Sequence, residues 1–252
     1  MKEQKVPVAM VDAEAKVVYY EYDGFEINTL LLTFKEKRRA LSTIEGCKKI
    51  EYAINTFVPS PLSARTMKNY VAFRKRLLHT LGIPYGVAAV LSTGVSMENL
   101  AFSKLSFEDF EVCCLATAGA AHNALRMGVD SAHWVERNGN YIYFSGTINI
   151  ILLTNAWFTV AAMARAIINV TEAKTAVLQD FNVKSSMAPE HQATGTGTDN
   201  VIIVSGVNSA LRVKCLGGHT KMGELIAVST RQAVAEALRR QDGLCRNARL
   251  EH

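Results

Sequence analysis

The sequence lacks any hydrophobic run long enough to cross a membrane. Its longest apolar-rich segments, such as residues 148–153, fall far short of the roughly 20 residues that a bilayer requires. The N-terminus also lacks the apolar core of a signal peptide, so we expect a cytoplasmic protein with no membrane partner. Only five residues are proline, and apolar residues (49%) far outnumber charged ones (20%), which excludes extensive disorder.

Cysteines are few and follow no metal-binding pattern. The five are Cys47, Cys113, Cys114, Cys215 and Cys245, an odd number without any Cys-x-x-Cys spacing. This usage predicts buried thiols in a reducing compartment and no cysteine-based metal site.

Charge of one sign is not concentrated either. The 28 basic and 23 acidic residues are scattered, apart from short basic clusters, so no nucleic-acid partner is expected.

The pattern along the chain predicts an α+β fold, a single domain with mixed β-sheets covered by about three long helices. Strands are expected at residues 17–20, 26–34, 39–43, 52–58, 87–91, 112–117, 141–144, 148–153, 201–204 and 211–215. Long helices are expected at 63–81, 159–180 and 220–240, with a short one around 122–128. The domain takes in residues 1–249, because Leu250-Glu251-His252 resembles an expression-tag scar.

A threonine–glycine turn is the most informative local feature. It consists of Thr194-Gly195-Thr196-Gly197-Thr198-Asp199 and precedes a short apolar strand. Glycine lets backbone N–H groups approach a ligand closely, and three hydroxyls add donors, so the turn is a candidate binding site. It equally suits a tight connection between two elements. The spacing is neither that of a phosphate-binding P-loop nor that of a dinucleotide fingerprint.

A second glycine pair stands at the start of the last long helix. Residues 217–218 are followed directly by His219. Thr220 is the expected N-cap of this helix, and Glu224 lies in its first turn. A histidine and a glutamate placed in this way could act as base and orienter for an attacking water. The alternative for Glu224 is a carboxylate that only complements the helix dipole.

Metal binding is a weaker interpretation of the same residues. His219 and Glu224 could share a metal ion with Asp199 or His191. No His-Glu-x-x-His or comparable ligand spacing supports this, so we expect no protein-bound metal.

Other polar residues follow strands or stand on the second long helix. His122 and Asn123 come after the strand 112–117, and Asn155 follows the strand 148–153. Such positions commonly bind ligands, although they also satisfy turn backbone. Glu172 and Lys174 stand two apart on a helix and do not face each other, so we interpret them as surface or interface charges.

Long strings of the sequence are shared with a known family. They are INIILLTNAWFTVAAMARAIINVTEAKTAVLQDFNVKS, ATGTGTDNVIIV and GGHTKMGELIA, with ALSTIEGCKKIEYAINTFVP, LGIPYGVAAVLSTG and LATAGAAHNALRMG upstream. In these strings the chain resembles the adenosylcobinamide amidohydrolases of corrinoid salvage, over roughly residues 25–240. The Thr-Glu-Ala-Lys, Thr-Gly-Thr-Gly-Thr-Asp and His-Thr-Lys-x-Gly-Glu elements, in that order, are specific together and weak singly.

The resemblance implies hydrolysis of the aminopropanol amide of adenosylcobinamide, giving adenosylcobyric acid and 1-amino-2-propanol for coenzyme B12 assembly. It also implies a corrinoid substrate that carries its own cobalt, and no further cofactor. In the family, the loop after the third strand tends to read Asn-Gly-Gly, whereas here it is Glu45-Gly46-Cys47. This departure could alter substrate preference or activity. A homo-oligomer is left open.

For amide hydrolysis we expect a single site. The catalytic candidates are Asp199, His219 and Glu224, as base, proton shuttle and orienter around an attacking water, with a threonine hydroxyl as the less simple nucleophile. The substrate-binding candidates are Thr194, Gly195, Thr196, Gly197, Thr198, Asn155, His122, Asn123, Gly218 and Thr220. This site requires the threonine–glycine turn and the helix led by His219 to meet on one concave surface. The alternatives are a non-catalytic corrinoid-binding protein and an unrelated hydrolase with a Thr or Cys nucleophile.

Overall fold

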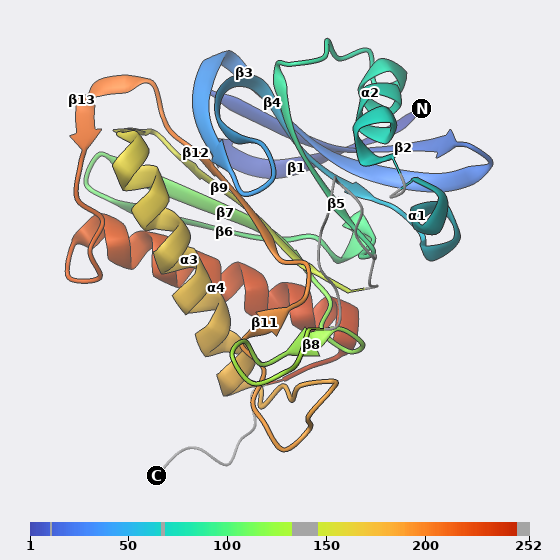
Figure 1. The fold of residues 1–252 in the computed structure, drawn as a ribbon. Helices are drawn as coiled ribbons and strands as arrows, with labels where there is room; N and C mark the ends of the chain where they lie inside the picture. The colour runs from blue at the N-terminus through green and yellow to red at the C-terminus, as the bar shows by residue number, and fades with distance from the viewer. Residues whose placement is uncertain (11, 67–68, 133–145, 246–252) are drawn as a thin grey trace.

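The computed structural model describes residues 1–10, 12–66, 69–132 and 146–245. Within them the chain forms one nine-stranded sheet, two short two-stranded pairs and four α-helices (Figure 1). The predicted α+β class is confirmed. The strand expected at 141–144 lies outside the described residues.

The large sheet contains β1 (Lys2–Met10), β2 (Ala13–Tyr22), β3 (Phe25–Ser42), β4 (Gly46–Phe57), β5 (Ala88–Thr93), β6 (Ala101–Phe107), β7 (Phe110–Ala118), β9 (Ile148–Thr154) and β12 (Asn200–Val204). The short pairs are β8 (Ala124–Leu125) with β11 (Gly195–Thr196), and β10 (Ala156–Phe158) with β13 (Asn208–Val213). The helices are α1 (Ser60–Thr66), α2 (Tyr70–Thr80), α3 (Val160–Asp180) and α4 (Lys221–Asp242), with a 3-10 turn η2 (Met97–Asn99).

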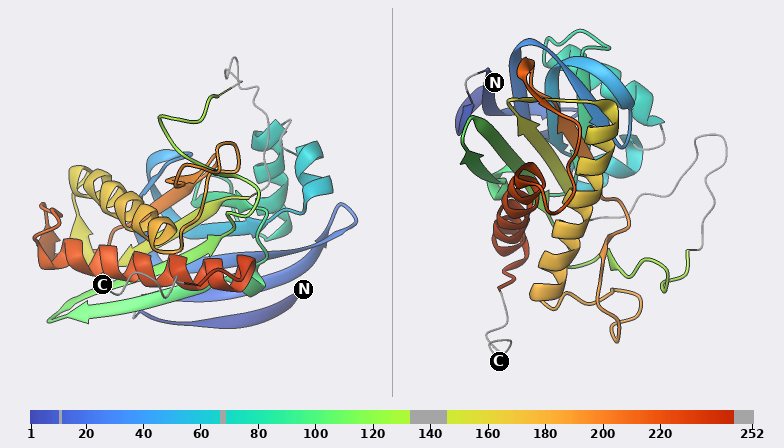
Figure 2. Two further views of the ribbon diagram at one scale, coloured as in Figure 1. Left: turned by 90° about the horizontal axis from the view of Figure 1, so that it is seen from below. Right: turned by 90° about the vertical axis from the view of Figure 1, so that its left-hand side faces the viewer.

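Strand β3 joins two halves of the large sheet. Its residues 25–34 pair with β2, and its residues 40–42 pair with β12, after an irregularity between Thr33 and Arg38 in its pairing with β4. The order is β1-β2-β3-β12-β9-β7-β6, with β4 and then β5 branching from β3. The two halves lie against each other (Figure 2). They enclose a buried apolar layer to which β3 contributes Leu30 and β9 contributes Ile151.

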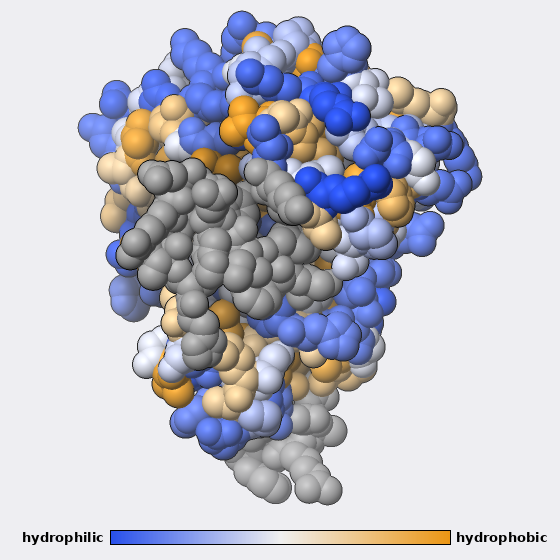
Figure 3. Space-filling model, turned by 45° about the vertical axis from the view of Figure 1, so that its right-hand side comes forward, coloured by the Kyte–Doolittle hydropathy of each residue, from blue (hydrophilic) through white to orange (hydrophobic). Residues whose placement is uncertain are grey.

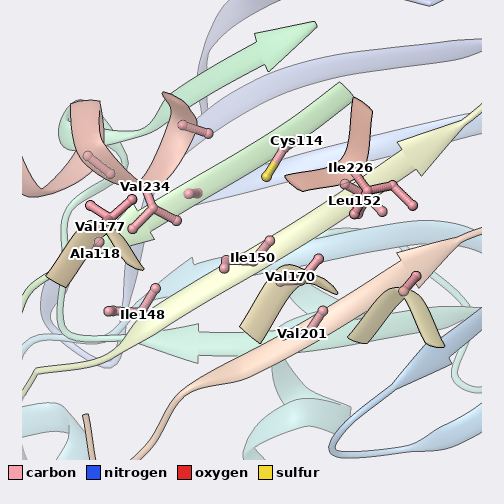
Figure 4. Packing of buried hydrophobic residues seen from close by; sticks show 14 of the residues in the cluster. Cys114, Ala118, Ile148, Ile150, Leu152, Val170, Val177, Val201, Ile226 and Val234 are labelled. Carbon is pink, nitrogen blue, oxygen red and sulfur yellow. The ribbon is translucent and has the colours of Figure 1, made fainter. Parts of the chain in front are cut away.

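Helices α3 and α4 cover the outer face of the β12-β9-β7-β6 half. Side chains of a strand alternate between its two faces. Ile150 and Leu152 of β9 therefore pack against the helices, whereas Ile151 and Leu153 belong to the layer between the halves (Figure 4). Burial of each such side chain contributes about 1.5–3 kcal/mol. On the other half, α1 and α2 pack against the opposite face through residues such as Leu77.

The helix boundaries follow from local capping. Thr159 and Thr220 are N-caps, and each hydroxyl oxygen accepts a hydrogen bond of 3.1 Å from the backbone N–H three residues on. Gly243 ends α4 with a positive φ of 67°. The long helices expected at 159–180 and 220–240 are thus confirmed. The single helix expected at 63–81 is wrong, because this segment holds the end of α1 and all of α2.

Two of the five cysteines are buried. Cys113 and Cys114 are neighbours on β7, and burial raises the pKa of the Cys113 thiol to about 12. Cys47, Cys215 and Cys245 are exposed, and all five are free thiols. The expectation of buried thiols therefore holds only for the pair on β7. In the described part of the chain, every helix is too short or too polar to span a membrane.

The large sheet has two distinct ends. Parallel strands β9 and β12 begin together, and antiparallel β7 finishes beside them, because Ala118 pairs with Ile148. We call this the Asp199 end, since Asp199 immediately precedes β12. The opposite end, where β9 and β12 finish, is called the His219 end. There β10 pairs with β13, which leads into His219 and α4.

Candidate active site

The structure places the two glycine motifs at opposite ends of the sheet. The threonine–glycine turn lies where β12 begins, whereas His219 follows β13 at the other end (Figure 1). Lys221 confirms this position, because its ammonium lies 5.1 Å from the ring centroid of Phe107, in the β6–β7 hairpin. A strand of the length of β9 spans about 20 Å. The expectation that Asp199, His219 and Glu224 share one catalytic centre is therefore wrong.

Two of the candidates at the His219 end, Thr220 and Glu224, have local structural contacts. Thr220 caps α4, and its hydroxyl also donates to the Gly217 carbonyl at 2.8 Å. Glu224 is exposed and pairs with Lys221 at 2.7 Å. His219 and Gly218 are exposed in the preceding loop.

Asn155 is also at the His219 end, and its side-chain amide forms hydrogen bonds with backbone groups. The oxygen accepts from the Glu111 N–H at 2.9 Å, and the nitrogen donates to the Asp109 carbonyl at 2.7 Å. These bonds close the turn before β7. The expectation that Asn155 belongs to the same substrate site as the threonine–glycine turn is wrong, because the two lie at opposite ends.

At the Asp199 end, the carboxylate of Asp199 receives four donors. One oxygen accepts from the Ile148 N–H at 3.1 Å and the Thr196 hydroxyl at 2.5 Å. The other accepts from the Thr196 N–H at 3.1 Å and from the ammonium of Lys174. Asp199 thereby ties the start of β9 to the turn and to α3.

Lys174 is a buried residue, contrary to the interpretation of a surface or interface charge. Its side chain is 10% exposed, and that of Asp199 is 16% exposed. The next residue, Thr175, donates its hydroxyl to the Thr194 carbonyl at 2.9 Å. The Thr-Glu-Ala-Lys element therefore fixes the turn from the helix side. Glu172 lies on the exposed face of α3, as expected.

Gly195 is required by the close approach of this ion pair. A Cβ at this position would lie 2.5 Å from an Asp199 carboxylate oxygen and 2.7 Å from the Lys174 ammonium. We expect Gly195→Ala to push the pair apart and to cost about 1–3 kcal/mol of unfolding free energy, as overpacking does. Gly218→Ala is the matched control, because no described atom lies within 4 Å of its Cβ position. Urea unfolding that gives equal stabilities for the two variants would contradict this assignment.

Asn123 connects the turn to the start of β9. Its amide nitrogen donates to the Gly146 carbonyl at 2.7 Å, and its backbone carbonyl accepts from the Gly197 N–H at 3.2 Å. The Thr198 hydroxyl donates to the same Gly146 carbonyl at 2.9 Å. The structure thus brings Asn123 together with the turn, as the sequence predicts for one site. Gly197 itself is exposed.

Sequence reasoning missed a cluster of buried polar side chains on the other face of β9. We call Asn55, Thr117, Thr147 and Asn149 the amide cluster. The Asn149 nitrogen donates to the Asn55 oxygen and to the Ser92 carbonyl, both at 2.9 Å. The Asn55 nitrogen donates to the Thr117 hydroxyl at 2.8 Å, and the Thr147 hydroxyl donates to the Thr198 carbonyl at 2.6 Å.

All four members of the amide cluster are less than 5% exposed. They come from β4, β7 and β9 and the residue before β9, so both halves of the sheet meet in them. An available signal was the asparagine at position 149 in an otherwise apolar strand, because buried amides require specific partners.

The unusual Glu45-Gly46-Cys47 loop lies at the same end. The Glu45 carboxylate, 6% exposed, pairs with Arg74 of α2 and with Lys48 at 3.1 Å. Burial lowers the pKa of both Arg74 and Lys48. The neighbouring Thr43 hydroxyl donates to the Asn200 side chain at 2.9 Å, next to Asp199.

The hydrogen bond from Thr43 to Asn200 places this loop at the border of the candidate site, and the Glu45–Arg74 ion pair connects it to α2. Strongly hydrophilic and apolar residues alternate over the face that carries α1 and α2 (Figure 3). The buried carboxylate of Glu45 in this loop pairs with two cationic side chains of the protein itself, Arg74 and Lys48. A substitution of this loop would therefore also disturb the packing of α2.

The chain matches known proteins over nearly its whole length. The family model described as adenosylcobinamide amidohydrolase matches residues 12–246. An uncharacterized protein of Methanocaldococcus jannaschii is 45% identical in an alignment of 234 residues that covers 88% of this chain and 91% of that protein.

Solved structures with a similar arrangement are more distant. The L-aminopeptidase D-Ala-esterase/amidase of Ochrobactrum anthropi has a TM-score of 0.46 at 9% identity, over 91% of this chain and 84% of that chain. A β-aminopeptidase of a Burkholderia species has a TM-score of 0.44 at 10% identity, over 92% of this chain and 86% of that chain.

Proposed function

Because the chain belongs to the adenosylcobinamide amidohydrolase family, we propose that it hydrolyses the aminopropanol amide of adenosylcobinamide. The products are adenosylcobyric acid and 1-amino-2-propanol, and the former can re-enter coenzyme B12 assembly. The observation that carries the proposal is the match of the family over residues 12–246. The cobalt of the corrinoid belongs to the substrate.

The Asp199 end supports this chemistry better than the His219 end. Amide hydrolysis needs donors for the oxyanion of a tetrahedral intermediate, a nucleophile and a proton for the leaving amine. Around the exposed Gly197, hydrogen bonds fix the turn and Asn123 in place, because the Asn123 amide donates to the Gly146 carbonyl at 2.7 Å and the Gly197 N–H donates to the Asn123 carbonyl at 3.2 Å. We propose that the scissile amide binds against these groups.

Water is the simplest nucleophile for this site. The hydroxyls of Thr196 and Thr198 donate to Asp199 and to the Gly146 carbonyl, and that of Thr194 accepts from the Met127 N–H at 3.0 Å. Each hydroxyl is therefore already engaged in holding the turn. The four donors on Asp199 occupy both of its carboxylate oxygens, so we assign it to positioning.

We also propose that the reaction needs no protein-bound metal. Among the described residues, no three His, Cys, Asp or Glu side chains are grouped as ligands for a metal ion. A chelator is therefore expected to leave turnover intact. Activity lost on chelation and restored by added zinc would contradict this part of the proposal.

Incubation of the purified protein with adenosylcobinamide tests the proposed reaction. We expect release of 1-amino-2-propanol and formation of a corrinoid carboxylate, both followed by mass spectrometry. Binding of the intact corrinoid without release of the amine would instead indicate a carrier protein. If the protein neither binds the corrinoid nor releases the amine, a corrinoid function is contradicted altogether.

A further inference from the structure

The loop of residues 119–123 lies across the Asp199 end and is fixed at several points. The Gly119 N–H donates to the Thr147 carbonyl at 3.1 Å, and the Ala120 N–H donates to the Asp242 carboxylate at 2.6 Å. At its other end, Asn123 binds the Gly146 carbonyl at 2.7 Å. A loop held in this way presents the side chain between its anchors, His122, in a defined place.

Asp242, the last residue of α4, holds the backbone just before His122. Its carboxylate accepts the Ala120 N–H at 2.6 Å, and the Ala121 N–H also donates to it. Burial raises the pKa of Asp242, while hydrogen bonds from Ala120 and Ala121 and the nearby His122 oppose this rise. The loop therefore joins an exposed imidazole to a half-buried carboxylate.

The acids near this site are committed to other contacts. Asp199 is surrounded by four donors, and Glu45 is paired with Arg74 and Lys48. His122 is exposed and adjoins Asn123, which holds the threonine–glycine turn. Imidazole is also the side chain that most often transfers protons in enzymes near neutral pH.

On this geometry, and resting on the proposed amide hydrolysis, we propose that His122 is the proton-transferring catalytic residue and that Asp242 positions it. His122 takes a proton from the attacking water while the water oxygen bonds to the amide carbon and the carbonyl electrons move onto oxygen. The imidazolium then returns this proton to the amide nitrogen as the C–N bond breaks. The products are the corrinoid carboxylic acid and 1-amino-2-propanol, so atoms and charges balance.

Variants of the full-length protein test this role with adenosylcobinamide as substrate. We expect His122→Ala and His122→Gln to lower kcat by about 100- to 10,000-fold with little change in KM, the range for loss of a general acid–base group. Free imidazole should partly rescue His122→Ala. Asp242→Asn, which keeps an acceptor for Ala120, should lower kcat less than the His122 variants do, again with little change in KM.

His191→Gln is the matched control. His191 is also exposed, lies in the loop after α3 and is 3.7 Å from the carboxylate of Glu190. We expect it to keep the wild-type kcat. If the wild type turns over and His122→Ala stays within a few-fold of it, or only His191→Gln is inactive, the role of His122 is overturned while the proposed function stands. A wild type that releases no amine overturns both.

Discussion

Replacing Asp199 with alanine is expected to lower the free energy of unfolding by about 3–5 kcal/mol, the usual cost of removing one partner of a buried ion pair. The change leaves the ammonium of Lys174 buried without its carboxylate, and it frees the Ile148 N–H and both donors of Thr196. Turnover should fall as well, because the start of β9 and the threonine–glycine turn lose their common anchor.

Glu224→Ala is the matched control for this experiment. Glu224 also pairs with a lysine, Lys221, but both side chains are about half exposed (54% and 44%). Exposed pairs contribute at most about 1 kcal/mol, so this variant should stay near wild type in stability and turnover. Urea unfolding and a turnover assay measure both. Losses of stability and turnover in Glu224→Ala as large as those in Asp199→Ala would contradict the assignment of the active site to the Asp199 end and not to the His219 end.

Replacing Asn149 with leucine is expected to have the second large effect. The variant has a similar volume but leaves the Asn55 side-chain oxygen and the Ser92 carbonyl without their donor. Each orphaned buried group costs about 1–3 kcal/mol. We therefore expect a loss of unfolding free energy of about 2–6 kcal/mol and a loss of turnover in the protein that still folds.

Asn169→Leu separates stability from catalysis. Asn169 on α3 is also buried, and its amide donates to the Leu216 carbonyl at 2.7 Å, in the loop that leads to the His219 end. This variant should lose stability but keep turnover per folded molecule. Equal turnover in the Asn149→Leu and Asn169→Leu variants, at matched folded fraction, would show that the amide cluster is structural only.

Local features of the fold could be predicted from the sequence. The periodicity of the sequence predicts a helix at 159–180, one residue longer than α3, and Thr220 is the N-cap of α4 as expected. Both depend on contacts between residues close in the chain, which local patterns encode.

The position of the site could not be predicted in the same way. Both glycine motifs adjoin a strand, but which end of the sheet each occupies depends on pairing partners far away in the chain. Lys174 stands 14 residues after Val160, the first residue of α3, and so lies about 21 Å along the helix from the His219 end. The amide cluster was missed for the same reason, because Asn55 and Asn149 meet only after the two halves of the sheet pack together.

The most direct test is the position of the corrinoid cobalt in crystals soaked with adenosylcobinamide, located by its anomalous scattering. We predict a peak at the Asp199 end, with the aminopropanol arm extending toward Asn123 and Gly197. A peak beside His219, at the start of α4, would contradict the assignment of the active site.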